Sequence, residues 1–173
     1  PFVATASFTG LDAASAIQVT GNTLTRDATW KASIPYAIIS SLRIQGADGA
    51  DTVTTLTLEP GAEVRFNAYR SLYIGSSGGD SGALVAQGTA AAPIRFTANS
   101  TTPAAGFWYG LSFQDTSDDA TTRLEHCIVE YGGSNYVPAV QVGNAAPSFT
   151  SVEFADNFFT DLSYNSGTVV GGA

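Results

Sequence analysis

The chain is poor in the side chains on which disulfide scaffolds, zinc sites and many enzymes depend. Its 173 residues include one cysteine, one histidine, one lysine and no methionine. A lone Cys127 cannot form an intrachain disulfide, and one cysteine with one histidine cannot build a four-ligand zinc site. His126 has no evident serine and aspartate partners for a catalytic triad. The sequence therefore favours neither a disulfide scaffold, nor a zinc protein, nor a triad hydrolase.

Charge is also scarce and has one dominant sign. Charged residues make up 13% of the chain, and 15 acidic against 7 basic side chains give a net charge of -8. Without a basic stripe, binding to nucleic acid or to an anionic membrane surface is not expected. No apolar run reaches the length of a membrane span. The chain opens on Pro1 and shows no signal peptide, which is compatible with a processed or excised segment of a secreted protein.

Helical periodicity is almost absent. The best candidate is a short turn near residues 11–16, which would cap one end of the fold. Elsewhere apolar and polar residues alternate with the period of two that is typical of strands, and clusters of Gly, Ser, Asn, Asp and Pro separate these stretches. The predicted strands are 16–20, 36–39, 41–45, 54–59, 63–66, 71–75, 83–87, 93–98, 110–114, 122–131, 139–142, 148–154 and 159–162.

One sequence pattern, a short strand of alternating apolar and polar residues followed by a turn, recurs in altered form. It reads LTLEPGAEVRF at 56–66, ALVAQGTAAAPIRFT at 83–97, GLSFQ at 110–114 and LEHCIVEYGG at 124–133. Such repetition predicts a solenoid, in which each repeat buries its apolar side on the next.

The phenylalanines that end these strands test the register of the repeat. The intervals that separate Phe66, Phe96, Phe113 and Phe154 along the sequence are unequal. This uneven spacing predicts coils with different loop lengths. We expect Phe66, Phe96 and Phe113 to stack inside. The same interior column should contain Leu58, Val64, Leu72, Ile74, Leu84, Ala86, Ile94, Leu111, Ile128, Val140 and Val142.

Taken together, the four segments resemble bacterial and archaeal surface proteins of the right-handed parallel β-helix class, the pectate-lyase-like solenoids. The resemblance covers roughly residues 20–165. It implies an all-β fold, a right-handed parallel β-helix of about six to seven coils, and a single domain over residues 1–173 with 1–20 as an N-terminal cap. The C-terminal residues SGTVVGGA include no polar cap, so the last coil is expected to be uncapped, or to stack on another domain or another copy of the chain.

Aromatic side chains form the first candidate site. Exposed rings on a rigid face could stack on the apolar faces of sugars, while nearby amides bind the hydroxyls. The alternative is corner packing for Trp108 and scattered surface rings. The predicted ligand-binding residues are Trp108, Tyr109, Tyr131, Tyr136 and Asn135, with Phe107, Tyr69, Tyr73 and Tyr164 as further rings and Asn67, Gln114 and Gln141 as further amides.

Two charged clusters are weaker candidates. Asp115, Asp118 and Asp119 could bind Ca²⁺ or supply an acid/base pair, although the segment lacks the pattern of a Ca²⁺ loop, and a solvated acidic loop is the alternative. The strand with Arg123, Glu125, Cys127 and Val129 on one face, and Leu124, His126, Ile128 and Glu130 on the other, could hold a lyase base. Ordinary ion pairs between coils are the alternative.

The β-helix class includes adhesins, polysaccharide lyases and hydrolases, so the resemblance constrains function less than fold. We expect a non-enzymatic structural or adhesive module, secreted or on the surface of a prokaryotic cell, with glycans as the first partner to test. The alternatives are a polysaccharide lyase or glycoside hydrolase, or a fragment of one, and a self-assembling filament subunit. No cofactor is expected, with Ca²⁺ as the sole candidate ion.

Overall fold

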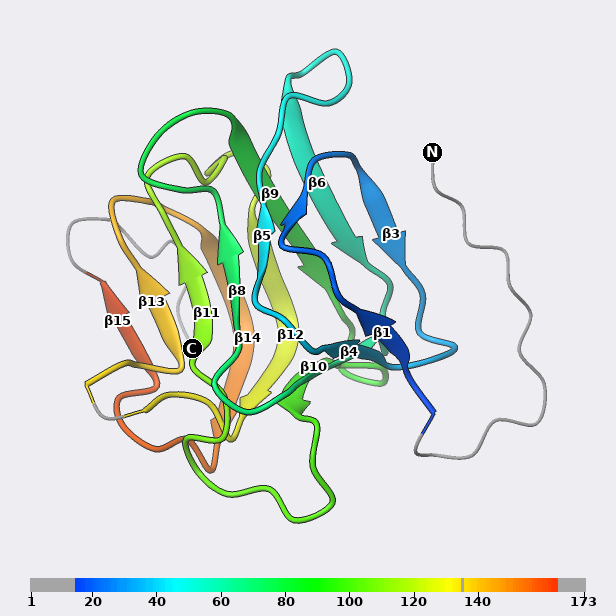
Figure 1. The fold of residues 1–173 in the computed structure, drawn as a ribbon, viewed down its shortest axis with the longest axis vertical. Coiled ribbons are helices and arrows are strands. Elements are labelled where there is room, and N and C mark those ends of the chain that lie inside the picture. The colour runs from blue at the N-terminus through cyan, green and yellow to red at the C-terminus, as the bar shows by residue number, and fades with distance from the viewer. Residues whose placement is uncertain (1–14, 135, 165–173) are drawn as a thin grey trace.

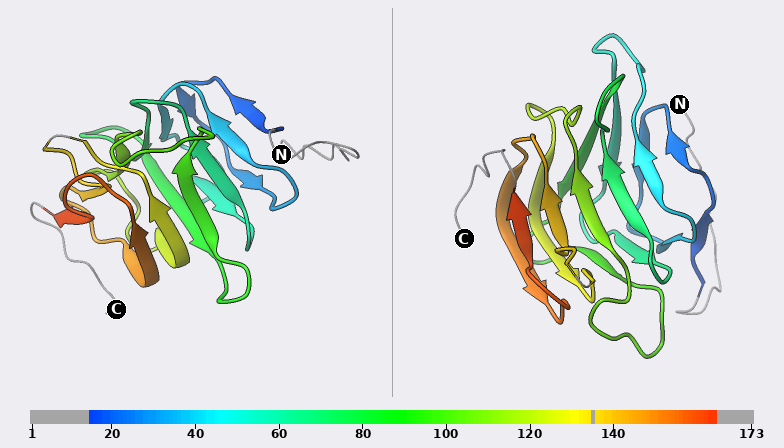
Figure 2. Two further views of the ribbon diagram at one scale, coloured as in Figure 1. Left: turned by 90° about the horizontal axis from the view of Figure 1, so that it is seen from below. Right: turned by 60° about the vertical axis from the view of Figure 1, so that its left-hand side comes forward.

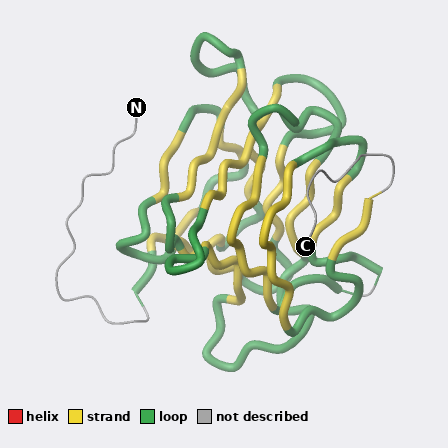
Figure 3. Tube along the Cα trace, turned by 180° about the vertical axis from the view of Figure 1, so that it is seen from behind, coloured by secondary structure: helices red, strands yellow, loops and turns green. Residues whose placement is uncertain are grey.

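The computed structural model describes residues 15–134 and 136–164, and the strands of this part form a parallel β-helix (Figure 1). Within these ranges there is no helix, and hence none suited to crossing a membrane (Figure 3). The strands are β1 (Ile17–Val19), β2 (Thr23–Leu24), β3 (Ala28–Trp30), β4 (Tyr36–Ile38), β5 (Leu42–Ile44), β6 (Val53–Leu58), β7 (Glu63–Phe66), β8 (Ser71–Ile74), β9 (Ser81–Gln87), β10 (Ile94–Ala98), β11 (Gly110–Phe113), β12 (Arg123–Glu130), β13 (Val140–Val142), β14 (Ser148–Ala155) and β15 (Leu162–Tyr164).

The strands form two sheets, and every pairing between strands is parallel. The six-stranded sheet has the order β15-β13-β11-β8-β5-β2, and Figure 2 shows its strands side by side in the right-hand view. The nine-stranded sheet is folded along its length, because the first half of β12 pairs with β9 and the second half pairs with β10. The bend occurs at His126, whose φ is 45°, and β14 bends in the same way at Ser151, whose φ is 52°. Each coil therefore has three faces.

The described residues contain five coils with three faces each and the first two faces of a sixth. Tyr36 pairs with Val64, Val64 with Phe96, Phe96 with Val129, and Val129 with Phe154. These equivalent positions are unevenly spaced along the sequence, because loop length differs from coil to coil, as predicted. The predicted turn near residues 11–16 and the C-terminal end of the chain lie mainly outside the described residues, so the coil count and end stacking of the whole chain stay predictions.

The core is a continuous column of inward-facing side chains. Phe66, Phe96 and Phe113 are all fully buried, as predicted, but they do not stack on one another. Phe96 lies opposite Val64, Phe66 lies opposite Ala98, and Phe113 belongs to the other sheet, where it pairs with Ile74. Full burial of each ring contributes about 1.5–3 kcal/mol. The predicted interior residues are buried except Ile128, which pairs with Arg95 and Glu153 on an outward face.

Asparagines occupy the turns that lead into the six-stranded sheet. The Nδ2 of Asn99 donates a 2.7 Å hydrogen bond to Oδ1 of Asn67 in the coil before it. In the next two coils, the Oδ1 of Asn157 accepts a 2.8 Å hydrogen bond from the backbone N–H of Gly132. Asn144 lies in the connection that leaves the six-stranded sheet after β13, and it has a positive φ of 51°. These side-chain hydrogen bonds align the turns of successive coils and thereby help to set the register between the coils.

Candidate functional site

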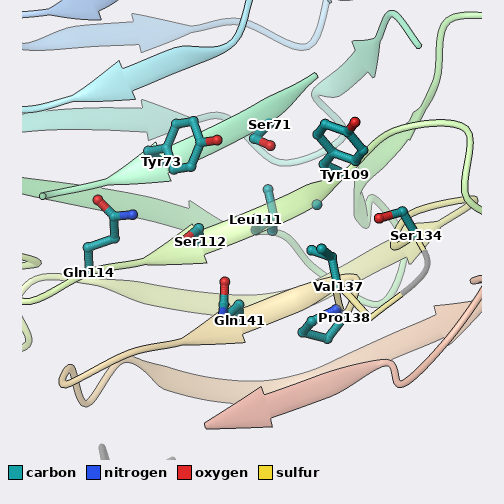
Figure 4. A pocket seen from close by; sticks show the side chains of 11 residues that line it. Ser71, Tyr73, Tyr109, Leu111, Ser112, Gln114, Ser134, Val137, Pro138 and Gln141 are labelled. Carbon is teal, nitrogen blue, oxygen red and sulfur yellow. The ribbon is translucent and has the colours of Figure 1, made fainter. Parts of the chain in front are cut away.

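The outer face of the six-stranded sheet carries a groove of about 410 Å³ (Figure 4). It crosses β8, β11 and β13, and the segment before β13 forms one end. The groove is lined by Ser71, Tyr73, Tyr109, Gly110, Leu111, Ser112, Gln114, Ser134, Val137, Pro138 and Gln141. None of these described lining residues is an acid, a histidine, a lysine or an arginine.

Strand alternation places the polar residues of the groove in one row. In β8, β11 and β13 the buried neighbours Leu72, Leu111 and Val140 face the core, so the next residue on each strand faces outward. The register pairs Tyr73 with Ser112 and Ser112 with Gln141. Because neighbouring strands lie about 4.8 Å apart, this row presents a ring, a hydroxyl and an amide at regular intervals.

Tyr109 forms the aromatic end of the groove. Its side chain is 39% exposed, and its ring lies 5.7 Å from that of Tyr69 at an interplanar angle of 48°. Gly110 follows with a φ of 125°, and a Cβ at this position would lie 2.4 Å from the backbone oxygen of Ala139. Glycine is required here for two reasons. Residues with a side chain rarely adopt this positive φ, and the backbone of the next coil leaves no space for a Cβ.

Arg43 of β5 supports the groove from the coil before it. It pairs in register with Tyr73, and its guanidinium carbon lies 4.8 Å from the centre of the Tyr73 ring. Its Nη1 donates to the backbone oxygen of Gly75 and, at 2.6 Å, to Oε1 of Gln114. One cation therefore contacts both a ring and an amide of the groove.

The predicted ligand-binding residues divide into three groups. Tyr109 lines the groove, and Tyr136, which is 89% exposed, lies in the segment whose residues Ser134 and Val137 line it. Tyr131 is half-buried against the core with a φ of 59° and does not line the groove. Asn135 lies outside the described residues.

For Trp108 the prediction of a ligand-binding role is wrong. Its side chain is fully buried, its ring stacks on Phe66 with centroids 4.0 Å apart, and its Nε1–H donates to the backbone oxygen of Glu130 at 2.9 Å. A buried indole offers no face to a ligand, so the corner-packing alternative holds for Trp108. The prediction went wrong because an aromatic run of three residues does not show which ring turns inward.

Sequence reasoning named Tyr73, Gln114 and Gln141 only as supporting residues, and it missed Arg43. The available signal for Arg43 was its place between Leu42 and Ile44, because a charged residue between two buried ones must face outward. Its partners could not be found in the same way. Gly75 and Gln114 are 32 and 71 residues away in the sequence, and only the register of the coils brings them together.

The predicted acidic cluster does not converge. The Oδ1 of Asp118 accepts a 2.9 Å hydrogen bond from the N–H of Thr121, and the Oδ1 of Asp119 accepts a 2.7 Å hydrogen bond from the N–H of Ala146. In the described part of the chain, no group of three or more acidic, histidine or cysteine side chains could hold a metal ion. Asp118 and Asp119 therefore act as caps for backbone N–H groups, and Asp115 does not join them in a metal site.

The predicted base cluster on β12 consists of ordinary contacts, two of them between coils and one local. Glu130 forms an ion pair with Arg95 at 2.7 Å, and Glu125 accepts a 3.0 Å hydrogen bond from Gln87. The Nε of Arg123 donates to the backbone oxygen of Thr121. The predicted faces of this strand are also wrong, because the bend at His126 shifts the alternation by one residue. Leu124 and Cys127 are therefore both buried.

A model of the pectate-lyase-like β-helix domain matches residues 21–139. The chain belongs to this family. All lining residues of the groove except Gln141 fall within the matched part of this β-helix domain. Searches of curated proteins and of solved structures gave no match.

Cys127 of this β-helix packs as a small apolar residue, as predicted. Its Sγ contacts the backbone oxygens of Ala86 and Glu125 at 3.4 Å. Burial, with a smaller contribution from the charge of Glu125, raises the pKa of the thiol from its ordinary value of 9.0 to about 12. The thiol is therefore expected to be a poor nucleophile in the folded protein.

This burial predicts a loss of stability at alkaline pH. Between pH 9 and 12 the unfolded thiol loses its proton while the folded thiol keeps it, so the free energy of unfolding falls by about 1.4 kcal/mol per pH unit from this group. Urea unfolding at several pH values would measure the slope. The Cys127→Ala variant, which keeps all other alkaline groups, should lack this part of it. Equal slopes in the two proteins would contradict the expectation.

Proposed function

We propose that this β-helix domain binds glycans in the groove of the six-stranded sheet and does not cleave them. The observation that carries the proposal is the lining, in which two tyrosine rings lie beside two glutamine amides and no carboxylate (Figure 4). The module would serve a structural or adhesive role on a prokaryotic cell surface or in the secreted fraction. Membership of the family supports the β-helix module, and its location is part of the proposal.

Sugars match this lining chemically. The faces of a pyranose ring are apolar and stack on aromatic side chains, whereas the hydroxyls at its edge need hydrogen-bond partners. Tyr73 and Tyr109 supply the rings, and Gln114, Gln141 and Ser112 supply donors and acceptors. Their backbones belong to or adjoin paired strands, so little conformational freedom is lost when a ligand binds.

The lining also lacks the groups that glycan cleavage requires. A glycoside hydrolase uses two carboxyl groups on either side of the scissile bond, and a lyase needs a base near the sugar ring. Among the described residues that line the groove, the only ionisable side chains are Tyr73 and Tyr109. This composition supports binding rather than catalysis as the function of the groove.

A glycan array with the whole chain, followed by incubation with each bound glycan, tests the proposal. Tyr73→Ala and Tyr109→Ala are each expected to weaken binding about tenfold or more, because each removes a stacking surface from the groove. Tyr164→Ala is the matched control, since this tyrosine is 63% exposed but does not line the groove. Isothermal titration would give the affinities, and reducing-end and unsaturated-product assays would detect cleavage.

Three outcomes would count against the proposal. Cleavage of a bound glycan would favour the alternative of a polysaccharide lyase or hydrolase. Binding that survives both tyrosine substitutions would place the site elsewhere on the molecule. Absence of binding to any glycan would leave a purely structural role or the filament alternative, which light scattering over a range of concentrations would then test.

A further inference from the structure

We propose that Arg43 is a positioning residue that sets the groove for uncharged glycans. It would do so by holding Gln114 as a hydrogen-bond donor and Tyr73 as a stacking surface. The inference rests on the proposed glycan-binding function of the groove and names the class of glycan that it selects.

Arg43 connects three successive coils. It lies on β5, its guanidinium covers the ring of Tyr73 on β8, and its Nη1 donates to Gln114, directly after β11. The same nitrogen donates to the backbone oxygen of Gly75, which fixes the guanidinium at a second point. A cation on one side of an aromatic ring restricts that ring and leaves its other side for a ligand.

The contact with Arg43 determines which end of the Gln114 amide faces the groove. An arginine can only donate hydrogen bonds, so it must contact the amide oxygen, and the Oε1–Nη1 distance is 2.6 Å. The NH₂ group then points toward the middle of the groove, as Figure 4 shows. Gln114 therefore presents a donor, which suits a sugar hydroxyl or ring oxygen as acceptor. Without Arg43 the amide could rotate and present either end.

The charge around the groove favours an uncharged ligand. The described lining residues carry no ionised group, and the chain as a whole has a net charge of -8, which disfavours an acidic polysaccharide. Arg43, a cation at the border of the groove, is already in contact with Tyr73, Gly75 and Gln114. A uronate could recruit Arg43 only by disturbing the contacts that order the groove.

The opposite role for Arg43 predicts a different ligand preference. If the guanidinium bound a ligand carboxylate directly, an acidic glycan would bind better than its neutral counterpart, and Arg43→Ala would remove that preference. A positioning role predicts that the neutral glycan binds better and that Arg43→Ala weakens its binding.

The test uses a neutral glycan that binds on the array and the same glycan oxidised at C6 to a uronate. We expect the wild-type chain to bind the neutral form about tenfold more tightly or better. Arg43→Ala and Gln114→Glu should each weaken neutral binding about five- to tenfold, the second because a glutamate keeps an acceptor for Arg43 but has no N–H for the ligand. In the Gln114→Glu background, Arg43→Ala should weaken binding by a smaller factor than it does in the wild-type chain, because the part of its effect that passes through Gln114 is already lost and only the part through Tyr73 remains.

Arg123→Ala is the matched control, because this arginine also donates to backbone oxygens but lies outside the groove. Thermal unfolding of every variant would show that the fold is intact. Additive effects of the Arg43 and Gln114 substitutions, or tighter binding of the uronate, would overturn the inference while leaving glycan binding in place. Failure of the wild-type chain to bind any glycan would instead refute the proposed function, and the inference with it.

Discussion

Trp108→Ala is expected to lower the free energy of unfolding by about 4 kcal/mol. The indole is fully buried and stacks on Phe66, and its edge lies against Gly132, where an added Cβ would be 3.2 Å from the ring. Its removal leaves a large cavity at the corner between two coils. It also leaves the backbone oxygen of Glu130 without its hydrogen-bond donor.

Urea unfolding followed by circular dichroism would measure the effect. Tyr109→Ala is a useful comparison, because it removes a neighbouring aromatic ring that is partly exposed and should cost much less. If Trp108→Ala were as stable as Tyr109→Ala, this would contradict the placement of the indole in the core. Because Trp108→Ala is expected to be destabilised, loss of glycan binding in this variant carries information about the site only where the variant is shown to be folded.

Gly82→Ala is expected to destabilise the fold by about 3 kcal/mol, or to prevent folding altogether. A Cβ at this position would lie 1.9 Å from the backbone oxygen of Ile44 and 2.7 Å from its carbonyl carbon. That oxygen also accepts a 3.0 Å hydrogen bond from the N–H of Gly75, so it cannot move freely. The clash therefore falls on backbone rather than on a flexible side chain, and the two coils would have to separate.

The control for this change is Gly21→Ala, because nothing lies within 4 Å of a Cβ at that position. Both variants replace one glycine by alanine, so both lower the conformational entropy of the unfolded chain by the same small amount. Thermal and urea unfolding should therefore separate them by the steric term alone. Equal stability of the two variants would contradict the close approach of β9 to the end of β5.

The alternation of apolar and polar residues predicted most of the strands, and the reason is physical. In β6, β7 and β10 inward residues are separated by outward ones over most of the strand, so the period of two follows from the pleat. The same reasoning failed on β12. A single residue with positive φ, His126, moves the strand from one face to the next and reverses which side chains point inward. No obvious turn signal marks that change, because neither glycine, proline, asparagine nor aspartate stands at the bend.

The candidate site was predictable only as a set of residue types. Aromatic and amide side chains were expected to lie together on one face, and Tyr73, Tyr109, Gln114 and Gln141 do so. Which ring turned inward, and which arginine supported the groove, depended on the pairing of coils with unequal lengths. That register is set by packing between segments far apart in sequence, which a single sequence does not display.

The turns that lead into the six-stranded sheet have a consequence for how this surface could change in evolution. The connection from the nine-stranded sheet is short before β5 and β8, and much longer before β11 and β13. The strands remain in register despite these differences, because loop length costs little free energy once the ends are fixed. Insertions and deletions at 99–107, just before Tyr109, could therefore reshape one end of the groove while the rungs beneath it stay as they are. Such a surface can acquire new ligand preferences by exchanging loops, with no need to redesign the core.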